Sequence, residues 1–172
     1  KEALERFYAR PDTLSLGVCN GCQLMMELGL ITPDDDKKGR MLHNDSHKFE
    51  SAFLGVDVPR NDSVMFGSLS GSKLGIWVAH GEGKFSLPYP EDHYNVVLKY
   101  AYSEYPGNPN GSDYSVAGIA SKDGRHLAMM PHLERACFPW NNAYYPLNRR
   151  GRDEVTPWIE AFVNARKWVE SH

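Results

Sequence analysis

The stretch Leu16-Gly17-Val18-Cys19-Asn20-Gly21-Cys22-Gln23 decides how this chain folds and where its chemistry lies. The apolar run Leu14–Val18 predicts a short buried strand, and the apolar periodicity of Leu24–Leu30 predicts a helix. Cys19 falls at the sharp turn between them, which is the position of the nucleophile in a strand–turn–helix elbow. A helix N-terminus that points at a thiol favours its thiolate and stabilises a developing oxyanion. We expect Gly17 and Gly21 to permit the tight, strained turn because glycine tolerates unusual backbone angles.

Other interpretations of the cysteines stay open at this point. A lone cysteine is often a core residue, and this applies to Cys19 too. Cys22 lies one helical turn further on, where its side chain points back toward the strand layer, so we expect it in the core. The spacing of Cys19 and Cys22 also allows a redox pair. The complete βαβ pattern that accompanies such a pair is not visible. Cys137 is expected to be a packing residue.

Composition narrows the class of protein. With 172 residues, 41% of them apolar, the chain is long enough to build one domain with its own core. A net charge of −3 provides no basic field for nucleic acid, and no apolar run is long enough for a membrane span. Three cysteines make no disulfide framework, and no secretory signal pattern is present. We therefore expect a cytoplasmic protein without a nucleic-acid or membrane partner. Because the first residue is Lys1, we also expect the chain to be part of a longer one.

The rest of the sequence predicts an α/β fold with a mixed sheet flanked by helices. Two helices are expected at the ends, over Lys1–Arg10 and from Thr156 as N-cap with Pro157 in the first turn. The apolar stripe of the second helix, which we expect to face the core, holds Trp158, Ile159, Phe162, Val163 and Val169. Between the ends, strands are expected over Leu14–Val18, Phe49–Val58, Leu74–Ala79, Val96–Tyr102, Val116–Ala120 and His126–Met130, and loops over Asp34–Gly39, Tyr105–Ser112 and Asn141–Val155.

A second chemical stretch, Pro131-His132-Leu133-Glu134-Arg135, follows the last of these strands. In extended chain, side chains at positions i and i+2 point the same way, so Glu134 can orient the imidazole of His132. A histidine next to a carboxylate is also common on protein surfaces. Together with Cys19, however, His132 and Glu134 supply the three roles of a nucleophile triad.

These motifs resemble the class I (triad) glutamine amidotransferases. The more specific resemblance is to the C-terminal glutaminase domains of the large, single-chain phosphoribosylformylglycinamidine synthases. It extends over essentially the whole chain. The motifs that carry it, in the order of that family, are Gly17–Gln23, Leu42–Ser46, Ala79–Gly83, Tyr105–Ser112, Pro131–Arg135 and Pro157–Arg166. The resemblance implies the flavodoxin-like sheet of that family.

The resemblance also implies roles for individual residues. Cys19 would attack the side-chain amide of glutamine, His132 would carry the proton to the leaving ammonia, and Glu134 would orient His132. The backbone N–H of Asn20 would be an oxyanion donor. Substrate would be held by Gln23, His80, Gly81 and Glu82. Ammonia would pass to a synthetase domain of the same polypeptide, where ATP and Mg²⁺ convert formylglycinamide ribonucleotide to the amidine. This chain has no glycine-rich phosphate loop with a lysine, so no cofactor is expected in it.

Two departures from the family and two further interpretations remain. The family has proline between the triad histidine and glutamate, where this chain has Leu133. Its N-terminal half-domain, with the first strands and a glycine-rich loop that gives a second oxyanion N–H, is expected to precede Lys1.

His43 and His47 share a loop, but no cysteine or carboxylate completes metal-ligand spacing there. The alternatives to a glutaminase are a non-catalytic docking module of the same fold, another triad amidotransferase or a cysteine peptidase.

Overall fold

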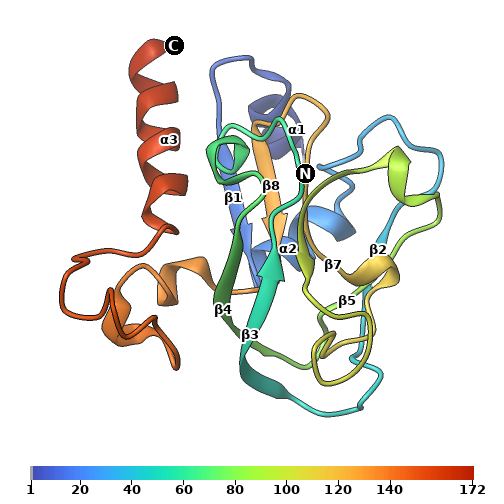
Figure 1. The fold of residues 1–172 in the computed structure, drawn as a ribbon. Coiled ribbons are helices and arrows are strands. Elements are labelled where there is room, and N and C mark those ends of the chain that lie inside the picture. The colour runs from blue at the N-terminus through green and yellow to red at the C-terminus, as the bar shows by residue number, and fades with distance from the viewer. Residues whose placement is uncertain (1) are drawn as a thin grey trace.

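A six-stranded sheet forms the centre of the computed structural model, which describes residues 2–172 (Figure 1). The strand order is β1-β8-β7-β6-β3-β4. Only β1 and β8 run parallel, and the other neighbours are antiparallel. This confirms the predicted mixed sheet. The strands are β1 (Ser15–Val18), β3 (Glu50–Asp57), β4 (Lys73–His80), β6 (Asn95–Tyr100), β7 (Val116–Ala120) and β8 (His126–Met129).

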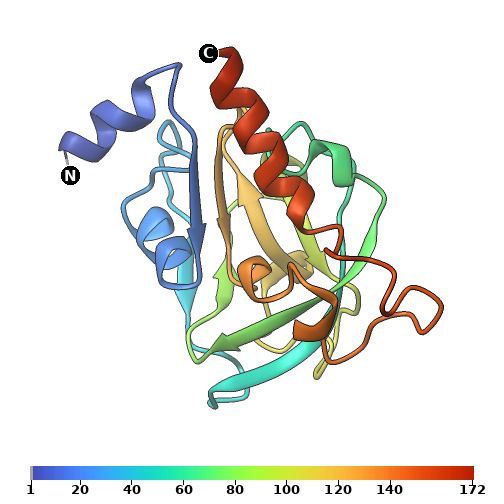
Figure 2. The same cartoon turned by 90° about the vertical axis from the view of Figure 1, so that its left-hand side faces the viewer.

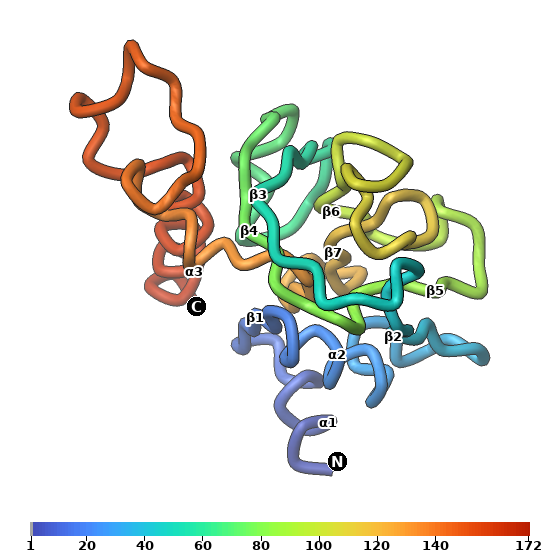
Figure 3. Tube along the Cα trace, turned by 90° about the horizontal axis from the view of Figure 1, so that it is seen from below, coloured from blue at the N-terminus to red at the C-terminus, as the bar shows by residue number. Residues whose placement is uncertain are grey.

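A small second sheet was not expected from the sequence. It pairs β2 (Arg40–Leu42) antiparallel with β5 (Lys84–Ser86), next to α2 and at one side of the main sheet (Figure 3). Three residues are too few for an alternating pattern to stand out, and the pairing joins segments more than forty residues apart. The small sheet positions the chain that leads into and out of the segment 80–83.

The helices cover the two faces of the main sheet (Figure 2). α1 (Glu2–Ala9) and α2 (Asn20–Glu27) lie on one side, and α3 (Ile159–Ser171) lies on the other. The alternation of side chains along β8 explains how both faces are filled. Leu127 and Met129 pack in a core that includes Trp158 and Ala161. Their neighbours on the other face, Ala128 and Met130, pack in a second core that includes Cys22, Met25 and Met26.

The boundaries of two helices differ from the prediction. α2 begins at Asn20, four residues before the apolar periodicity starts, because the turn at Cys19 leads directly into the helix. α3 begins at Ile159 rather than at Pro157. Thr156 is buried, and its hydroxyl donates to the carbonyl of Ala136 at 2.7 Å and accepts from the N–H of Trp158 at 3.3 Å. Thr156 therefore caps the start of α3 and also ties it to the chain at Ala136.

The surfaces of the terminal helices are less buried than the sequence predicts. Phe162 and Val169 of α3 are 37% and 60% exposed, so the expectation that they face the core is wrong. The helix packs instead through Trp158, Ile159, Ala161 and Ala165, a narrower stripe. α1 is confirmed over Glu2–Ala9 but buries none of its residues, and Lys1 lies outside the described residues. Within residues 2–172, every helix is too short or too polar to cross a membrane.

Candidate active site

The turn between β1 and α2 holds Cys19 in a strained conformation. Its φ of 52° and ψ of −105° lie outside the regions that a residue with a side chain normally adopts, which costs about 1–3 kcal/mol. Both backbone groups of Cys19 are used: its N–H donates to the carbonyl of Met129 at 2.9 Å, and its carbonyl accepts from the N–H of Gln23 at 3.0 Å. The elbow predicted from the sequence is confirmed.

The glycines on either side of Cys19 act differently from the prediction, since neither has a positive φ. A Cβ on Gly17 would lie 2.2 Å from the sulfur of Met25 and 2.8 Å from the backbone of Gly21. Gly17 thus allows β1 and α2 to approach closely. A Cβ on Gly21 would meet nothing within 4 Å. The backbone strain lies on Cys19, and Gly21 leaves space beside it.

His132 and Glu134 form the predicted pair at the end of β8. The Nδ1 of His132 lies 2.6 Å from Oε1 of Glu134. A carboxylate only accepts hydrogen bonds, so Nδ1 carries the proton and Nε2 is left with a lone pair. His132 is 7% exposed, and its Nε2 is buried without a hydrogen-bond partner among residues 2–172. Leu133, between the two, is fully buried in the core. His132 is therefore oriented as a base with an unused nitrogen.

The sheet brings Cys19 and His132, which are more than a hundred residues apart in sequence, to the same edge of two adjacent strands. β1 and β8 are parallel neighbours, with Val18 opposite Met129, so both residues follow the carboxyl ends of adjacent strands. Both also contact β4: the thiol of Cys19 lies 3.7 Å from the carbonyl of Ala79, and the N–H of His132 donates to the carbonyl of Trp77 at 2.8 Å. These two carbonyls point to the same edge of β4, roughly 7 Å apart along the strand.

The segment 80–83 closes the site on the side of α2. The side-chain amide of Gln23 donates to the carbonyl of Glu82 at 2.8 Å, which joins two of the predicted substrate-binding residues. The carboxylate of Glu82 is exposed and lies 3.4 Å from Nδ1 of His43. The carbonyl of Gly81 accepts from the N–H of Asn44 at 2.9 Å. The hydrogen bond between Gln23 and Glu82 thus joins the first turn of α2 to the segment 80–83.

Asn110 and Ser112 fix the segment 80–83 in place through hydrogen bonds to Gly83. Both are buried, and they donate to the carbonyl of Gly83 at 2.6 Å and 3.4 Å. The predicted turn Tyr105–Ser112 therefore supports the segment 80–83 through its last residues.

A buried asparagine, Asn44, holds the segment 80–83 by hydrogen bonds to His80 and Gly83, which sequence reasoning missed. It is 0% exposed and bonds to His80, Gly83 and Lys48. The motif Leu42–Ser46 contributed to the resemblance, but no role followed from it because all these partners except Lys48 lie 36 or 39 residues away.

The first turn of α2 offers backbone N–H groups next to the sulfur. The first intrahelical acceptor, the carbonyl of Cys19, is taken by Gln23, so the N–H groups of Asn20 and Gly21 have no acceptor one turn back. Asn20, directly after Cys19, carries the first of these N–H groups. Cys22 is fully buried, and burial raises the pKa of its thiol, which argues against the redox pair. Cys137 is buried against the carbonyl of Leu133, as predicted.

Comparison with known proteins agrees with this geometry. Residues 1–169 match the CobB/CobQ-like glutamine amidotransferase domain family. The chain belongs to this family. Its nucleophile elbow and its His–Glu pair are therefore features of an amidotransferase domain.

The relatives of this amidotransferase domain are much longer proteins. It is 40% identical to the probable phosphoribosylformylglycinamidine synthase, chloroplastic/mitochondrial, of Arabidopsis thaliana, over 97% of this chain and 13% of that protein. It is 42% identical to the phosphoribosylformylglycinamidine synthase of Homo sapiens, over 96% of this chain and 14% of that one. Among solved structures, that of PurLQS from Thermotoga maritima matches with a TM-score of 0.67 and 29% identity, over 98% of this chain and 65% of that chain. The chain thus spans about a seventh of the length of these curated relatives.

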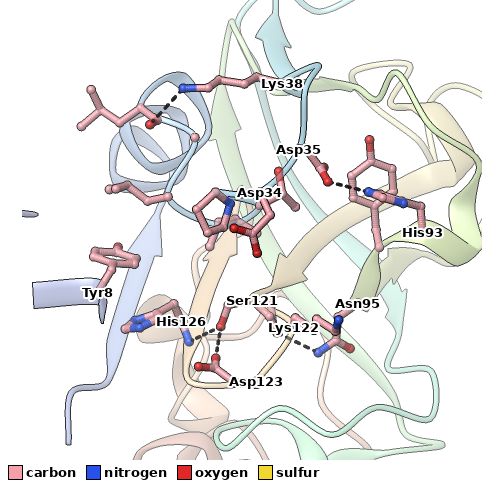
Figure 4. A pocket seen from close by; sticks show the side chains of 18 of the residues that line it. Tyr8, Asp34, Asp35, Lys38, His93, Asn95, Ser121, Lys122, Asp123 and His126 are labelled. Carbon is pink, nitrogen blue, oxygen red and sulfur yellow. Dashed lines mark hydrogen bonds and ion pairs between the residues drawn. The ribbon is translucent and has the colours of Figure 1, made fainter. Parts of the chain in front are cut away.

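A large cavity of the amidotransferase domain lies away from this site (Figure 4). Its volume is about 1240 Å³, and its lining includes Tyr8, Asp35, His93 and His126. His126 is the first residue of β8 and pairs with the first residue of β1, so the cavity lies at the opposite end of these strands from Cys19. None of the predicted site residues lines it. Within residues 2–172, no group of three metal-ligating side chains is found.

Proposed function

We propose that this chain hydrolyses the side-chain amide of glutamine with Cys19 as nucleophile, His132 as base and acid, and Glu134 as the group that orients His132. One observation carries the proposal. A strained elbow cysteine follows β1, and an oriented histidine, whose buried Nε2 has no partner among residues 2–172, follows the adjacent parallel strand β8. An activated thiol next to such a base is the arrangement that acyl transfer requires.

In the first half of the reaction, the sulfur of Cys19 attacks the carboxamide carbon. The thiol proton goes to Nε2 of His132, a C–S bond forms, and the tetrahedral oxyanion is held by the N–H of Asn20 at the start of α2. The C–N bond then breaks, and His132 gives its proton to the leaving nitrogen. The products of this half are ammonia and a γ-glutamyl thioester on Cys19.

In the second half, water attacks the thioester. His132 accepts a proton from the water, a C–O bond forms, the C–S bond breaks, and the proton returns to the sulfur of Cys19. The sum is glutamine plus water giving glutamate plus ammonia. Glu134 remains a carboxylate throughout and stabilises the imidazolium that forms in each half. We assign Gln23, His80, Gly81 and Glu82 to the glutamine pocket because the hydrogen bond from Gln23 to Glu82 joins the segment 80–83 to the first turn of α2, next to Cys19.

We further propose that the ammonia is used by a synthetase domain of the same longer polypeptide, with residues 1–172 as its C-terminal amidotransferase portion. That domain would convert formylglycinamide ribonucleotide to the amidine with ATP and Mg²⁺, neither of which is assigned a site here. The names and lengths of the relatives support this proposal. We place the reaction in the cytoplasm because the three cysteines are free thiols, as in a reducing compartment.

Two measurements test the proposal in the protein at its natural length. A glutamine analogue with an electrophilic carbon at the amide position should label Cys19, as read by peptide mass spectrometry. Cys19→Ala should lower glutamine hydrolysis by roughly 10⁴-fold or more while ammonia-dependent synthesis continues. Cys137→Ala is the matched control, since that thiol is buried and should leave both activities within about threefold. Full glutamine use by Cys19→Ala would make the chain a docking module instead.

A further inference from the structure

A tryptophan of β4, Trp77, contacts both ends of the segment that carries the proposed base and its orienting carboxylate. The backbone carbonyl of Trp77 accepts from the N–H of His132 at 2.8 Å, at the start of the segment 132–141. The indole Nε1–H of Trp77 donates to the carbonyl of Asn141 at 2.7 Å, at the end of that segment. One residue therefore closes the whole segment into a loop against the sheet.

The indole of Trp77 is itself held on the face of the sheet. Trp77 pairs with Phe53 in the register of β3 and β4, and their rings meet edge to face with centroids 5.1 Å apart. A Cβ on Gly75 would lie 2.4 Å from the ring of Phe53, so this ring covers Gly75, which lies on the same face as Trp77. Trp77 is half-buried and packs against the core. Its N–H is therefore directed at a fixed point.

The carboxylate of Glu134 has few contacts of its own to fix its position. Its side chain is 47% exposed. Among residues 2–172 it has two charged partners, Nδ1 of His132 at 2.6 Å and Nε of Arg135 at 3.6 Å. A hollow of about 390 Å³ lies beside it, and its lining includes Trp77, Glu134 and Asn141. Because water has access to this hollow, the contact of Glu134 with His132 depends on where the backbone of the segment is held.

Other contacts fix the buried side of the segment 132–141. Leu133 lies in the core, and the carbonyl of Ala136 accepts from the hydroxyl of Thr156 at 2.7 Å. These contacts do not reach the end of the segment at Asn141. The indole bond of Trp77 holds that end beside the hollow, next to Glu134.

We propose that Trp77 is a positioning residue of the reaction: by holding Asn141 against β4, its indole keeps Glu134 on Nδ1 of His132. This inference rests on the proposed glutaminase function. A displacement of a catalytic group by about 1 Å costs up to roughly 10²-fold in rate. The indole bonds to Asn141 and, among residues 2–172, to no residue assigned to the glutamine pocket. The effect of losing it should therefore appear in kcat and not in KM.

The test removes the indole N–H in the protein at its natural length. Trp77→Phe keeps a ring against Phe53 but leaves the carbonyl of Asn141 without its donor. It should lower kcat for glutamine by about 5- to 15-fold, with KM within about threefold. The value of kcat is expressed per site that an electrophilic glutamine analogue labels at Cys19, so that unfolded protein is not counted.

A double-mutant cycle with Glu134→Ala distinguishes positioning from a merely structural role. In the Glu134→Ala background, Trp77→Phe should lower kcat by less than about twofold, because no carboxylate is left to position. A structural role would lower kcat by the same factor in both backgrounds. The rate at which the analogue labels Cys19 gives a second reading of the same cycle.

The matched control is Trp158→Phe. The indole of Trp158 also donates to a backbone carbonyl, that of Gly75 at 2.9 Å, but it makes no hydrogen bond to the segment 132–141 among residues 2–172. This variant should leave kcat within about threefold in both backgrounds. An equal loss from Trp77→Phe in both backgrounds, a change confined to KM, or no loss at all would overturn the inference. None of these outcomes touches the glutaminase itself, which full glutamine use by Cys19→Ala would reject.

Discussion

Each end of the strands β1 and β8 holds a buried histidine whose Nε2 has no hydrogen-bond partner among residues 2–172, yet only the carboxyl end is proposed to carry chemistry. At the carboxyl end, Nδ1 of His132 is bound by a carboxylate, and a cysteine in a strained conformation lies on the adjacent strand. At the amino end, Nδ1 of His126 lies 2.9 Å from the hydroxyl of Ser15, and its ring packs against Tyr8 with centroids 4.1 Å apart.

The comparison teaches that a large cavity is a poor guide to this active site. The amino end borders the cavity of about 1240 Å³, but its histidine is paired with a hydroxyl and an aromatic ring. A hydroxyl stabilises an imidazolium less than a carboxylate does. Burial even lowers the pKa of His126, the change that disfavours a protonated intermediate. The proposed site is distinguished instead by a strained cysteine, an oriented base and helix N–H groups at the carboxyl end of these strands.

The largest effect on activity is expected from replacing His132, and it distinguishes His132 from His126. His132→Ala should lower glutamine hydrolysis by roughly 10³- to 10⁴-fold because it removes the group that carries the proton in both halves of the reaction. His126→Ala should change it by less than about threefold. Steady-state release of ammonia, measured for both variants after their folding is verified by circular dichroism, checks this. A loss of similar size in His126→Ala would remove the distinction between the two ends.

A second experiment tests how closely the elbow is packed. Gly17→Ala should destabilise the fold by about 2–4 kcal/mol, because its Cβ would overlap Met25 and the backbone of Gly21. Gly21→Ala is the matched control: it meets open space and replaces glycine in a helix, so it should be neutral or stabilising by up to about 1 kcal/mol. Urea unfolding of both variants measures the difference. Equal stabilities would mean that β1 and α2 are not in close contact at Gly17.

Much of this end of the molecule was predictable because its signals are local. Cys19 stands between an apolar run and a helical periodicity, and His132 and Glu134 are two residues apart after a strand. The structure confirms both features. The position of the strain was not predictable in detail. It lies on Cys19 and not on the glycines, because that depends on how β1 and α2 pack together.

The remaining features depend on pairings that are distant in the sequence. The role of Asn44 follows from hydrogen bonds to His80 and Gly83, and no periodicity of the sequence reports such contacts. The small sheet of β2 and β5 was missed because each strand has only three residues. For α3, the stripe pattern predicted burial of Phe162 and Val169, but the residues described around them leave both exposed.

A third prediction concerns pH and compares His80 with His126. Because the folded state holds the pKa of His80 near 4, below its usual 6.5, the unfolded chain binds more protons between these values. Stability should therefore be highest above pH 6.5, fall as the pH drops and lose up to about 3 kcal/mol by pH 4.

Urea unfolding at pH 7.5, 5.5 and 4.5 measures this fall. His80→Gln should flatten it more than His126→Gln, since a glutamine does not titrate in this range. If His80→Gln loses stability with the same slope as the unchanged protein, His80 is not held neutral by the fold.

The smallest effect is expected at Leu133, where the sequence resemblance implies proline in the family. It begins the short helical turn Leu133–Arg135, where proline is well tolerated, and the N–H that proline would remove donates to no acceptor among residues 2–172. Leu133 is fully buried, so the smaller ring of proline leaves some space in the core, while its rigidity favours folding. Leu133→Pro should therefore change stability by only about 1 kcal/mol and activity by less than about threefold, whereas Leu133→Ala should cost about 2–4 kcal/mol. Thermal unfolding with glutaminase assays of both variants measures this, and a large gain in activity with proline would show that the backbone between His132 and Glu134 limits catalysis here.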